Sequence, residues 1–301
     1  MRTLGNYKPF LSGKFEISAG LKLIKPPGKI FEIDDNYQAY IAEKQVARKE
    51  NLSKYYPQGS RLSDDHSKQV CDYILSKLIS EYPDLFDFNN NQFTNRKTGE
   101  MITINSFNDV DSNYYSYRDL FDAVCSQVQE DCSIWKIDGN EEYLASIHLC
   151  YPNHWNPTNK INENFSVVHA PVADFEKLNR AGFALLKQIT NKGPFTRFAW
   201  GLATDKVLNH HPDNEFKGRS FNVLSPKLYA RVERQTTSPF PELGLSLFTI
   251  KTYFVDCEKD LNQYEREQLI SAIESMSLSS SQYKGISKTR DSIVEWLSSL
   301  N

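Results

Sequence analysis

The segment Lys227–Val255, KLYARVERQTTSPFPELGLSLFTIKTYFV, decides the fold class of this 301-residue chain. Apolar and polar residues alternate over Lys227–Thr236 and again over Leu245–Val255, which is the two-residue period of a β-strand. The intervening segment Pro239–Gly244 contains two prolines and a glycine, a composition typical of a turn. We therefore expect two long strands that pair antiparallel.

More strands are expected on the N-terminal side of this pair. Ile134–Ile137 and Tyr143–Cys150 flank an Asp138-Gly139 turn, which is a strong hairpin signal, and Phe195–Ala203 is a further strand. Phe165–His169 is also interpreted as a strand that ends just before Ala170-Pro171. Because proline restricts the residue before it, Ala170 is expected to be extended.

Helical spacing of apolar residues appears on both sides of the strands. Helices are expected at about residues 35–51, 64–82, 118–130, 171–190, 261–276 and 290–300. The polar segment 84–117 is expected to hold one hairpin closed by Lys97-Thr98-Gly99, and the serine-rich Ser277–Gln282 is interpreted as a helix connection.

This order of elements predicts an α+β fold built around an antiparallel sheet. A single domain of residues 1–301 is expected, with a helical and extended N-terminal part (1–117), a sheet core (118–256) and C-terminal helices (257–301). No G-x-G-x-x-G, no G-x-x-x-x-G-K-[ST] and no nucleophile elbow occurs, so the sequence favours neither a nucleotide-binding fold nor a serine hydrolase.

Composition limits the classes of partner. Hydrophobic residues make up 40% and charged residues 24%, the net charge is −3 and no basic block occurs, which argues against nucleic acid as a partner. No apolar run approaches the roughly 20 residues of a membrane span, so a soluble, cytoplasmic protein is expected. The five cysteines form no C-x-x-C pair, which predicts reduced thiols and no structural zinc site.

Three of the six histidines, His148, His154 and His169, lie within residues 147–172. His169 could bind a metal, transfer a proton or simply hydrogen-bond to backbone, and the residues alone leave these roles open. His148 and Cys150 share a strand face but give only a weak metal signal. His210-His211 lies in a polar loop and is expected to be solvated.

A second group of polar residues lies on one strand face. The period of two places Arg231, Glu233 and Gln235 together, either as a solvated face or as the polar wall of a ligand cavity. In a cavity, the carboxylate could hold a cationic amine and the arginine could bind ligand carboxylates. Arg197 and Trp200 fall on opposite faces of their strand, with Trp200 expected in the core.

The ordered set of motifs resembles the haem-dependent oxidative N-demethylases, a family of amine monooxygenases. The matching residues run from about residue 7 to residue 300. They are Gly20-Leu21-Lys22-Leu23, Ile33-Asp34, Gln129-Glu130-Asp131, Leu149-Cys150-Tyr151-Pro152, Trp155, Lys160, His169-Ala170-Pro171-Val172, Arg197, Trp200, Arg231-Val232-Glu233-Arg234-Gln235-Thr236, Phe248-Thr249-Ile250, Thr252-Tyr253 and Tyr283-Lys284-Gly285. Two departures from the family pattern are Ala173-Asp174 after Val172, and Ala199 where the family tends to have asparagine.

The resemblance implies a PAS-like sheet with additional N- and C-terminal helices that encloses haem b. It implies oxidative demethylation of a small secondary amine such as dimethylamine with O2, releasing formaldehyde. Electrons from NAD(P)H would arrive through a separate flavin/iron-sulfur reductase. His169 is expected to be the axial iron ligand, Glu233 the amine-facing carboxylate, and Arg231, Arg197 and Lys160 the partners of the haem propionates. The alternative is a non-catalytic PAS-like protein that binds haem or another flat ligand as a sensor.

Overall fold

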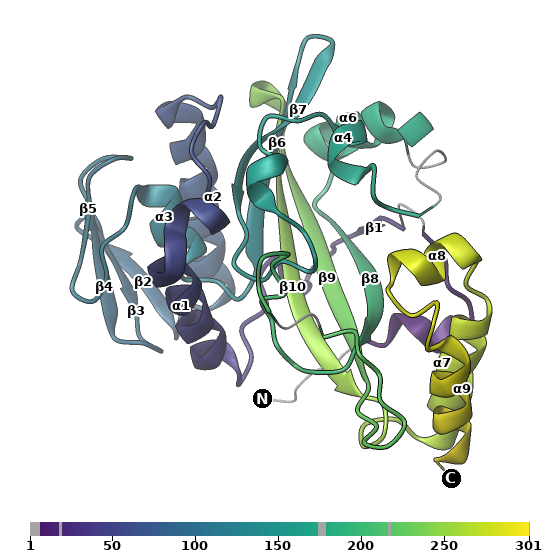
Figure 1. The fold of residues 1–301 in the computed structure, drawn as a ribbon. Helices are drawn as coiled ribbons and strands as arrows, with labels where there is room; N and C mark the ends of the chain where they lie inside the picture. Colours follow the sequence, from purple (N-terminus) through teal and green to yellow (C-terminus); the bar gives the residue numbers. More distant parts are fainter. Residues whose placement is uncertain (1–6, 18–19, 174–178, 216–217, 301) are drawn as a thin grey trace.

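The computed structural model describes residues 7–17, 20–173, 179–215 and 218–300 (Figure 1). Within these ranges the chain is a mixed α+β protein, as the sequence predicts, and it contains two antiparallel sheets where one sheet and a hairpin were expected. None of the helices found there combines the length and the apolar character that a membrane crossing requires.

The larger sheet holds six described strands in the order β1-β8-β9-β10-β6-β7. These are β1 (Lys22–Leu23), β6 (Asp131–Asp138), β7 (Glu141–His148), β8 (Phe195–Ala203), β9 (Tyr229–Phe240) and β10 (Leu245–Asp256). β9 and β10 pair antiparallel along their whole length, as expected from their alternation. The last strand, β10, lies between β9 and β6, so the chain returns to the middle of the sheet with its final strand.

Residues 37–125 form a separate layer beside this sheet, at the left of Figure 1. It contains the helices α1 (Tyr37–Tyr55), α2 (Asp64–Glu81) and α3 (Leu120–Cys125). It also contains a four-stranded sheet of β2 (Phe86–Asn89), β3 (Gln92–Asn95), β4 (Glu100–Ile104) and β5 (Val110–Ser112). The expected hairpin is β3–β4, with Gly99 at φ 77° in its turn. The outer strands β2 and β5 and the shortness of α3 differ from the sequence-based expectation.

Buried apolar side chains cover both faces of the larger sheet. Ile134, Leu245 and Leu247 join the N-terminal layer in one core, and Trp200 and Val232 pack against the C-terminal helices in another. Those helices are α7 (Gln263–Glu274), α8 (Leu278–Tyr283) and α9 (Arg290–Ser299). The opposite face, which carries Trp135, is covered by α4 (Phe165–His169) and α6 (Gly182–Asn191).

The segment before α6 departs most from the sequence-based expectation. Residues 165–169 form the short helix α4 and not a strand, because the side chain of Asn164 accepts a hydrogen bond from Val167 N and caps a helical turn. Ala170 is helical (φ −49°, ψ −35°) despite the following Pro171, so the expected extended conformation is wrong. The helix expected over 171–190 is described only from Gly182, and residues 174–178 lie outside the described part.

The serine-rich segment is also helical, although it was expected to be a connection. Ser277 caps α8 by accepting a hydrogen bond from Ser280 N, which offsets the weak helix propensity of serine. The helix ends at Tyr283 with Lys284 as its C-cap, and Gly285 then takes the left-handed conformation at φ 73°. This ending places Tyr283 and Lys284 at the cavity described below.

Candidate functional site

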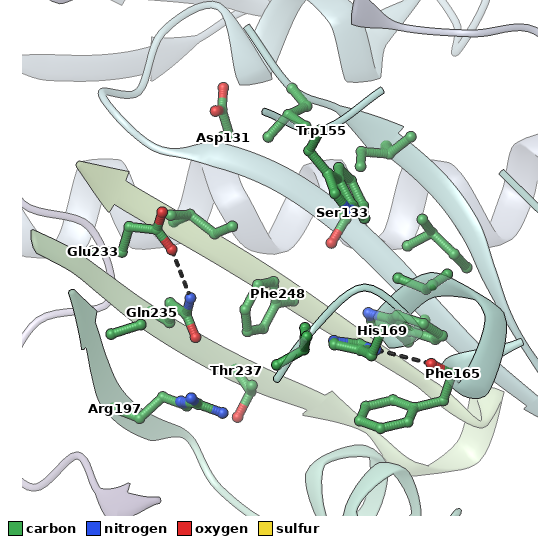
Figure 2. Close-up of a pocket in the computed structure, with 18 of the residues that line it drawn as sticks. Asp131, Ser133, Trp155, Phe165, His169, Arg197, Glu233, Gln235, Thr237 and Phe248 are labelled. Atoms are coloured by element: carbon green, nitrogen blue, oxygen red, sulfur yellow. Dashed lines mark hydrogen bonds between the residues drawn. The ribbon is translucent and has the colours of Figure 1, made fainter. Parts of the chain in front are cut away.

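A cavity of about 280 Å³ lies between the larger sheet and the α4–α6 layer (Figure 2). This volume is close to the lower end of ligand pockets, about 300–1,000 Å³. Its walls are largely apolar and aromatic, with polar groups on the strands β6, β8 and β9 and at Lys284. The aromatic lining residues are Trp135, Tyr151, Trp155, Phe165, Phe248 and Tyr283. Flat apolar walls with a few polar groups are suited to a planar ligand.

His169 lies at the end of α4 and lines this cavity. Its Nδ1 donates a hydrogen bond to the carbonyl oxygen of Phe165 at 2.9 Å, one turn earlier in the same helix. Its ring stacks on Phe165, with centroids 4.0 Å apart, and lies 6.0 Å from Trp135. Burial lowers the pKa of His169 to about 4, and the positive charges of Arg197 and Lys160 act in the same direction.

This arrangement fixes the chemical form of the His169 ring. A neutral imidazole whose Nδ1–H is held by a carbonyl carries its lone pair on Nε2. In metal-binding histidines, the ring N–H that does not face the metal commonly donates a hydrogen bond to a backbone carbonyl oxygen in this way. His169 is thus available as a metal ligand, although it comes from a helix terminus and not from a strand.

Glu233 and Gln235 project from β9 into the cavity, on the face that the period of two predicts. Gln235 Nε2 donates to Glu233 Oε2 at 3.0 Å, which leaves further acceptor capacity on the carboxylate. The alternative of a fully solvated face does not apply, because these side chains are half-buried in the cavity wall.

Arg197 enters the same wall from β8, cross-strand from Gln235. Among the described residues, its buried Nε has no hydrogen-bond partner, and neither does the Oγ1 of Thr237. Burial lowers the pKa of Arg197, and the carboxylate of Glu233 opposes this shift. Because buried charges are normally paired, an unpaired guanidinium at a cavity wall fits an anionic group of a ligand. Trp200 is in the core, as expected.

Arg231 is placed differently. It shares the face of Glu233, but its guanidinium donates to the carbonyl oxygens of Tyr151 at 3.0 Å, Leu208 at 3.0 Å and Val207 at 3.1 Å. It also lies 3.4 Å from His210 Nδ1. The loop 205–211 thus covers this end of the strand, and Arg231 is buried behind the cavity wall. His210 and His211 are buried with it, which corrects the expectation that they are solvated.

Lys160 also hydrogen-bonds to a backbone segment next to the cavity. Its Nζ donates to the carbonyl oxygen of Val167 at 2.9 Å, in the turn of α4 that carries His169. The structure therefore brings His169, Glu233 and Arg197 together at one cavity. Lys160 and Arg231 instead donate hydrogen bonds to backbone carbonyl oxygens of segments that border this cavity.

The sequence analysis did not single out two cavity residues, Asp131 and Lys284. Asp131 accepts hydrogen bonds from Cys150 N at 2.7 Å and Tyr151 N at 3.0 Å, and burial raises its pKa to about 6. Burial lowers the pKa of Lys284 to about 8, while Glu233 opposes the shift. Both residues belong to motifs that match the family pattern, which was the signal available for finding them.

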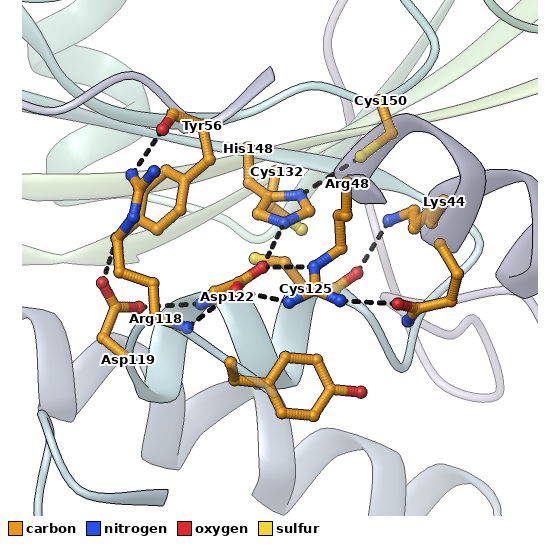
Figure 3. Close-up of polar contacts among 12 residues, drawn as sticks. Lys44, Arg48, Tyr56, Arg118, Asp119, Asp122, Cys125, Cys132, His148 and Cys150 are labelled. Carbon is orange, nitrogen blue, oxygen red and sulfur yellow. Dashed lines mark hydrogen bonds and ion pairs between the residues drawn. The ribbon is translucent and has the colours of Figure 1, made fainter. Parts of the chain in front are cut away.

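His148 and Cys150 belong to a buried polar cluster on the other face of the sheet (Figure 3). His148 Nε2 lies 3.0 Å from Asp122 Oδ1, and Asp122 also pairs with Arg48 at 2.7 Å. Burial opposes ionisation of Asp122, but these two partners hold the pKa of its carboxyl far below the ordinary range. The cluster joins α1, α3 and β7. In the described ranges, no group of three His, Cys, Asp or Glu side chains is arranged to hold a metal ion, and all five cysteines are free and buried.

Residues 21–294 match the model of the family described as haem-dependent oxidative N-demethylase, alpha subunit-like. The chain belongs to this family. The matched range includes all the lining residues of the cavity except Ile17.

The two departures from the family pattern differ in their position. Ala199 lies directly cross-strand from Glu233 and lines the cavity. Ala173 is buried, while Asp174 lies outside the described residues. Only the change at Ala199 therefore has a described effect on the site, where a small methyl group faces the carboxylate.

Proposed function

We propose that this protein binds haem b in the cavity and oxidatively demethylates a small amine with O2, releasing formaldehyde. The observation that carries the proposal is the state of His169. Its imidazole is neutral and oriented by the carbonyl of Phe165, and it lines an aromatic cavity in a chain of a haem-dependent family. When bound, the haem would supply the activation of O2 and the oxidation of an N-methyl group.

The residues present fit this group. His169 Nε2 would bind the iron, and the apolar side chains around it would contact the macrocycle. Arg197 would bind a propionate, because its guanidinium is buried at the cavity wall and its Nε lacks a partner among the described residues. Lys160 and Arg231 would act indirectly, since they hold the backbone of α4 and of the loop 205–211.

Glu233 is proposed as the group that orients the amine. A substrate ammonium can donate to the carboxylate oxygens that Gln235 leaves available. An ion pair in a partly desolvated cavity is stronger than one in water, which favours a cationic ligand at this position. The aromatic and aliphatic walls leave His169 and Glu233 only half-exposed, which strengthens electrostatic interactions at both groups relative to water.

The reaction with O2 also requires electrons, which we propose come from another protein. Electrons from NAD(P)H would be delivered by a separate flavin/iron-sulfur reductase, and a cytoplasmic location is proposed for both proteins. The chain is proposed to act as a single domain, because Ile134 and Leu247 of the sheet share a core with the N-terminal helices.

Hemin titration of the purified protein tests the haem site. Wild type is expected to give a Soret band, and His169→Ala to bind hemin at least about tenfold more weakly. His66→Ala on α2 is the matched control and should bind as wild type does. Wild-type protein that stays colourless with excess hemin would contradict the proposal.

Activity is tested on the hemin-loaded protein with dimethylamine, O2 and a chemical reductant. Formaldehyde release is expected from wild type, and Glu233→Gln should reduce it by raising the KM for the amine. Hemin binding without formaldehyde from any methylated amine would instead support the alternative, a non-catalytic haem-binding sensor.

A further inference from the structure

The register of β8 and β9 places Glu233 between two cations. Ala199 lies directly opposite Glu233, and Arg197 and Gly201 are its neighbours on the same face of β8. The side chain of Lys284 lies over Gly201. A Cβ added at Gly201 would be 3.3 Å from Lys284 Cδ and 3.7 Å from its Nζ. Arg197 therefore lies diagonally from Glu233 on one side, with its guanidinium directed toward Thr237 (Figure 2), and Lys284 lies over Gly201 on the other side.

Neither cation has a carboxylate partner in the part of the chain that the structure describes. No ion pair within 4.0 Å involves Arg197, Lys284 or Glu233. The Nζ of Lys284 lies 5.2 Å from the ring centroid of Tyr283 and 5.7 Å from that of Phe15. Positive charge at a cavity wall without a protein partner is complementary to an anionic group of a ligand.

The other carboxylate of the cavity does not balance these charges. Asp131 accepts two backbone N–H groups, from Cys150 and Tyr151. The positive charges of Lys44 and Arg231 also act on it from behind the wall. Arg197 is assigned to a haem propionate above, so Lys284 and Glu233 remain as one cation and one carboxylate at this end of the cavity. A simple dialkylammonium would bind Glu233 and leave Lys284 without an anion, whereas a zwitterion would offer an opposite charge to both side chains.

Space next to Glu233 also favours a larger ligand than dimethylamine. The methyl group of Ala199 lines the cavity at the cross-strand position, where asparagine would project further and offer polar atoms of its own. A substituent on the amine can therefore extend along β8 toward Arg197 or toward Lys284.

We propose that Lys284 binds a carboxylate of the substrate whose ammonium faces Glu233, so that the amine is an N-methyl amino acid. This inference rests on the proposed function of the cavity. The same carboxylate chemistry is present in the haem propionates, and the experiment below separates the two sources.

Binding of N-methylglycine, dimethylamine and acetate is measured by calorimetry on the protein with and without hemin. Wild type is expected to bind N-methylglycine at least about tenfold more tightly than dimethylamine. Lys284→Met should bring the two affinities within about twofold by weakening only N-methylglycine, and Lys284→Arg should retain the preference. Lys288→Met, at an exposed position after α8, is the matched control.

A second variant tests the position of Lys284 without removing its charge. Gly201→Ala presses on the Lys284 stem and should reduce the N-methylglycine preference by a smaller factor. If wild type binds dimethylamine as tightly as N-methylglycine, the inference is wrong. The inference is also wrong if Lys284→Met keeps the preference for N-methylglycine but weakens the binding of hemin without weakening that of iron protoporphyrin dimethyl ester. In that case Lys284 binds a haem propionate and not a carboxylate of the substrate. Absence of hemin binding by wild type would instead reject the proposed function, while calorimetry still reports on Lys284.

Discussion

At the scale of single residues, the two-residue period correctly placed Glu233 and Gln235 on one strand face, and the structure shows that this face lines a cavity. The same period grouped Arg231 with them, but the loop 205–211 covers that end of the strand and binds the guanidinium. The two-residue period predicts which residues share a strand face, but it does not predict which other segment of the chain packs on that face. The partners of a buried charge come from segments far along the chain, so they could not be predicted from the sequence alone.

Arg231→Met tests the structural role of this arginine. The substitution leaves the carbonyl oxygens of Tyr151, Leu208 and Val207 without their donor, so the free energy of unfolding should fall by about 3 kcal/mol. Urea unfolding measures the change. Arg61→Met is the control, because the Arg61–Glu141 pair is exposed and should contribute less than about 1 kcal/mol. Equal effects of the two substitutions would contradict the assignment.

At the scale of elements, the strands of the larger sheet were predicted well because their alternation is long and regular. The helix α4 was mistaken for a strand, since its five residues are too few to show a helical period and include two β-branched valines. The information that separates the two conformations is the Asn164 cap, one residue outside the element. Short capped helices are thus the elements that periodicity misses.

Asn164→Ala tests the link between this cap and the site. Removing the hydrogen bond to Val167 N should lower the free energy of unfolding by about 1 kcal/mol. It should also weaken hemin binding several-fold, because α4 carries His169. Asn262→Ala in the capping box of α7 is the matched control, with a similar loss of stability and unchanged hemin affinity. Hemin titration and urea unfolding of both variants decide the point.

At the scale of the whole molecule, the sequence predicted the α+β class and the order of helices and sheet. It did not predict how the N-terminal segment joins the sheet. Arg234, on the face opposite Glu233, donates to the carbonyl oxygens of Ile30 and Lys29, and Lys251 pairs with Asp34 at 2.7 Å. Glu130 is fully buried in the same junction and accepts a hydrogen bond from Glu32 N. This junction depends on contacts between distant segments, which no local pattern encodes.

The junction makes stability depend on pH through Glu130. Burial raises its pKa from 4.5 to about 7. Between these values the folded protein binds more protons than the unfolded chain, so this group's contribution to stability falls as the pH rises. Glu130→Gln should remove that dependence. Between pH 5 and pH 7.5, the free energy of unfolding of wild type should fall by about 2 kcal/mol relative to the variant.

Urea unfolding at the two pH values measures this difference. Glu258→Gln, at an exposed position after β10, is the control and should follow the wild-type profile. Parallel pH profiles of wild type and Glu130→Gln would show that the junction tolerates the charged carboxylate.

The central place of β10 has a consequence for synthesis. Because β10 joins β9 to β6, a nascent chain cannot close the sheet until residue 256 has left the ribosome. Until then the hydrogen-bonding edges of β6 and β9 stay open to other chains. The cavity on this sheet can therefore form only after β10 has emerged, and chains that terminate before residue 256 should aggregate instead of accumulating as folded fragments.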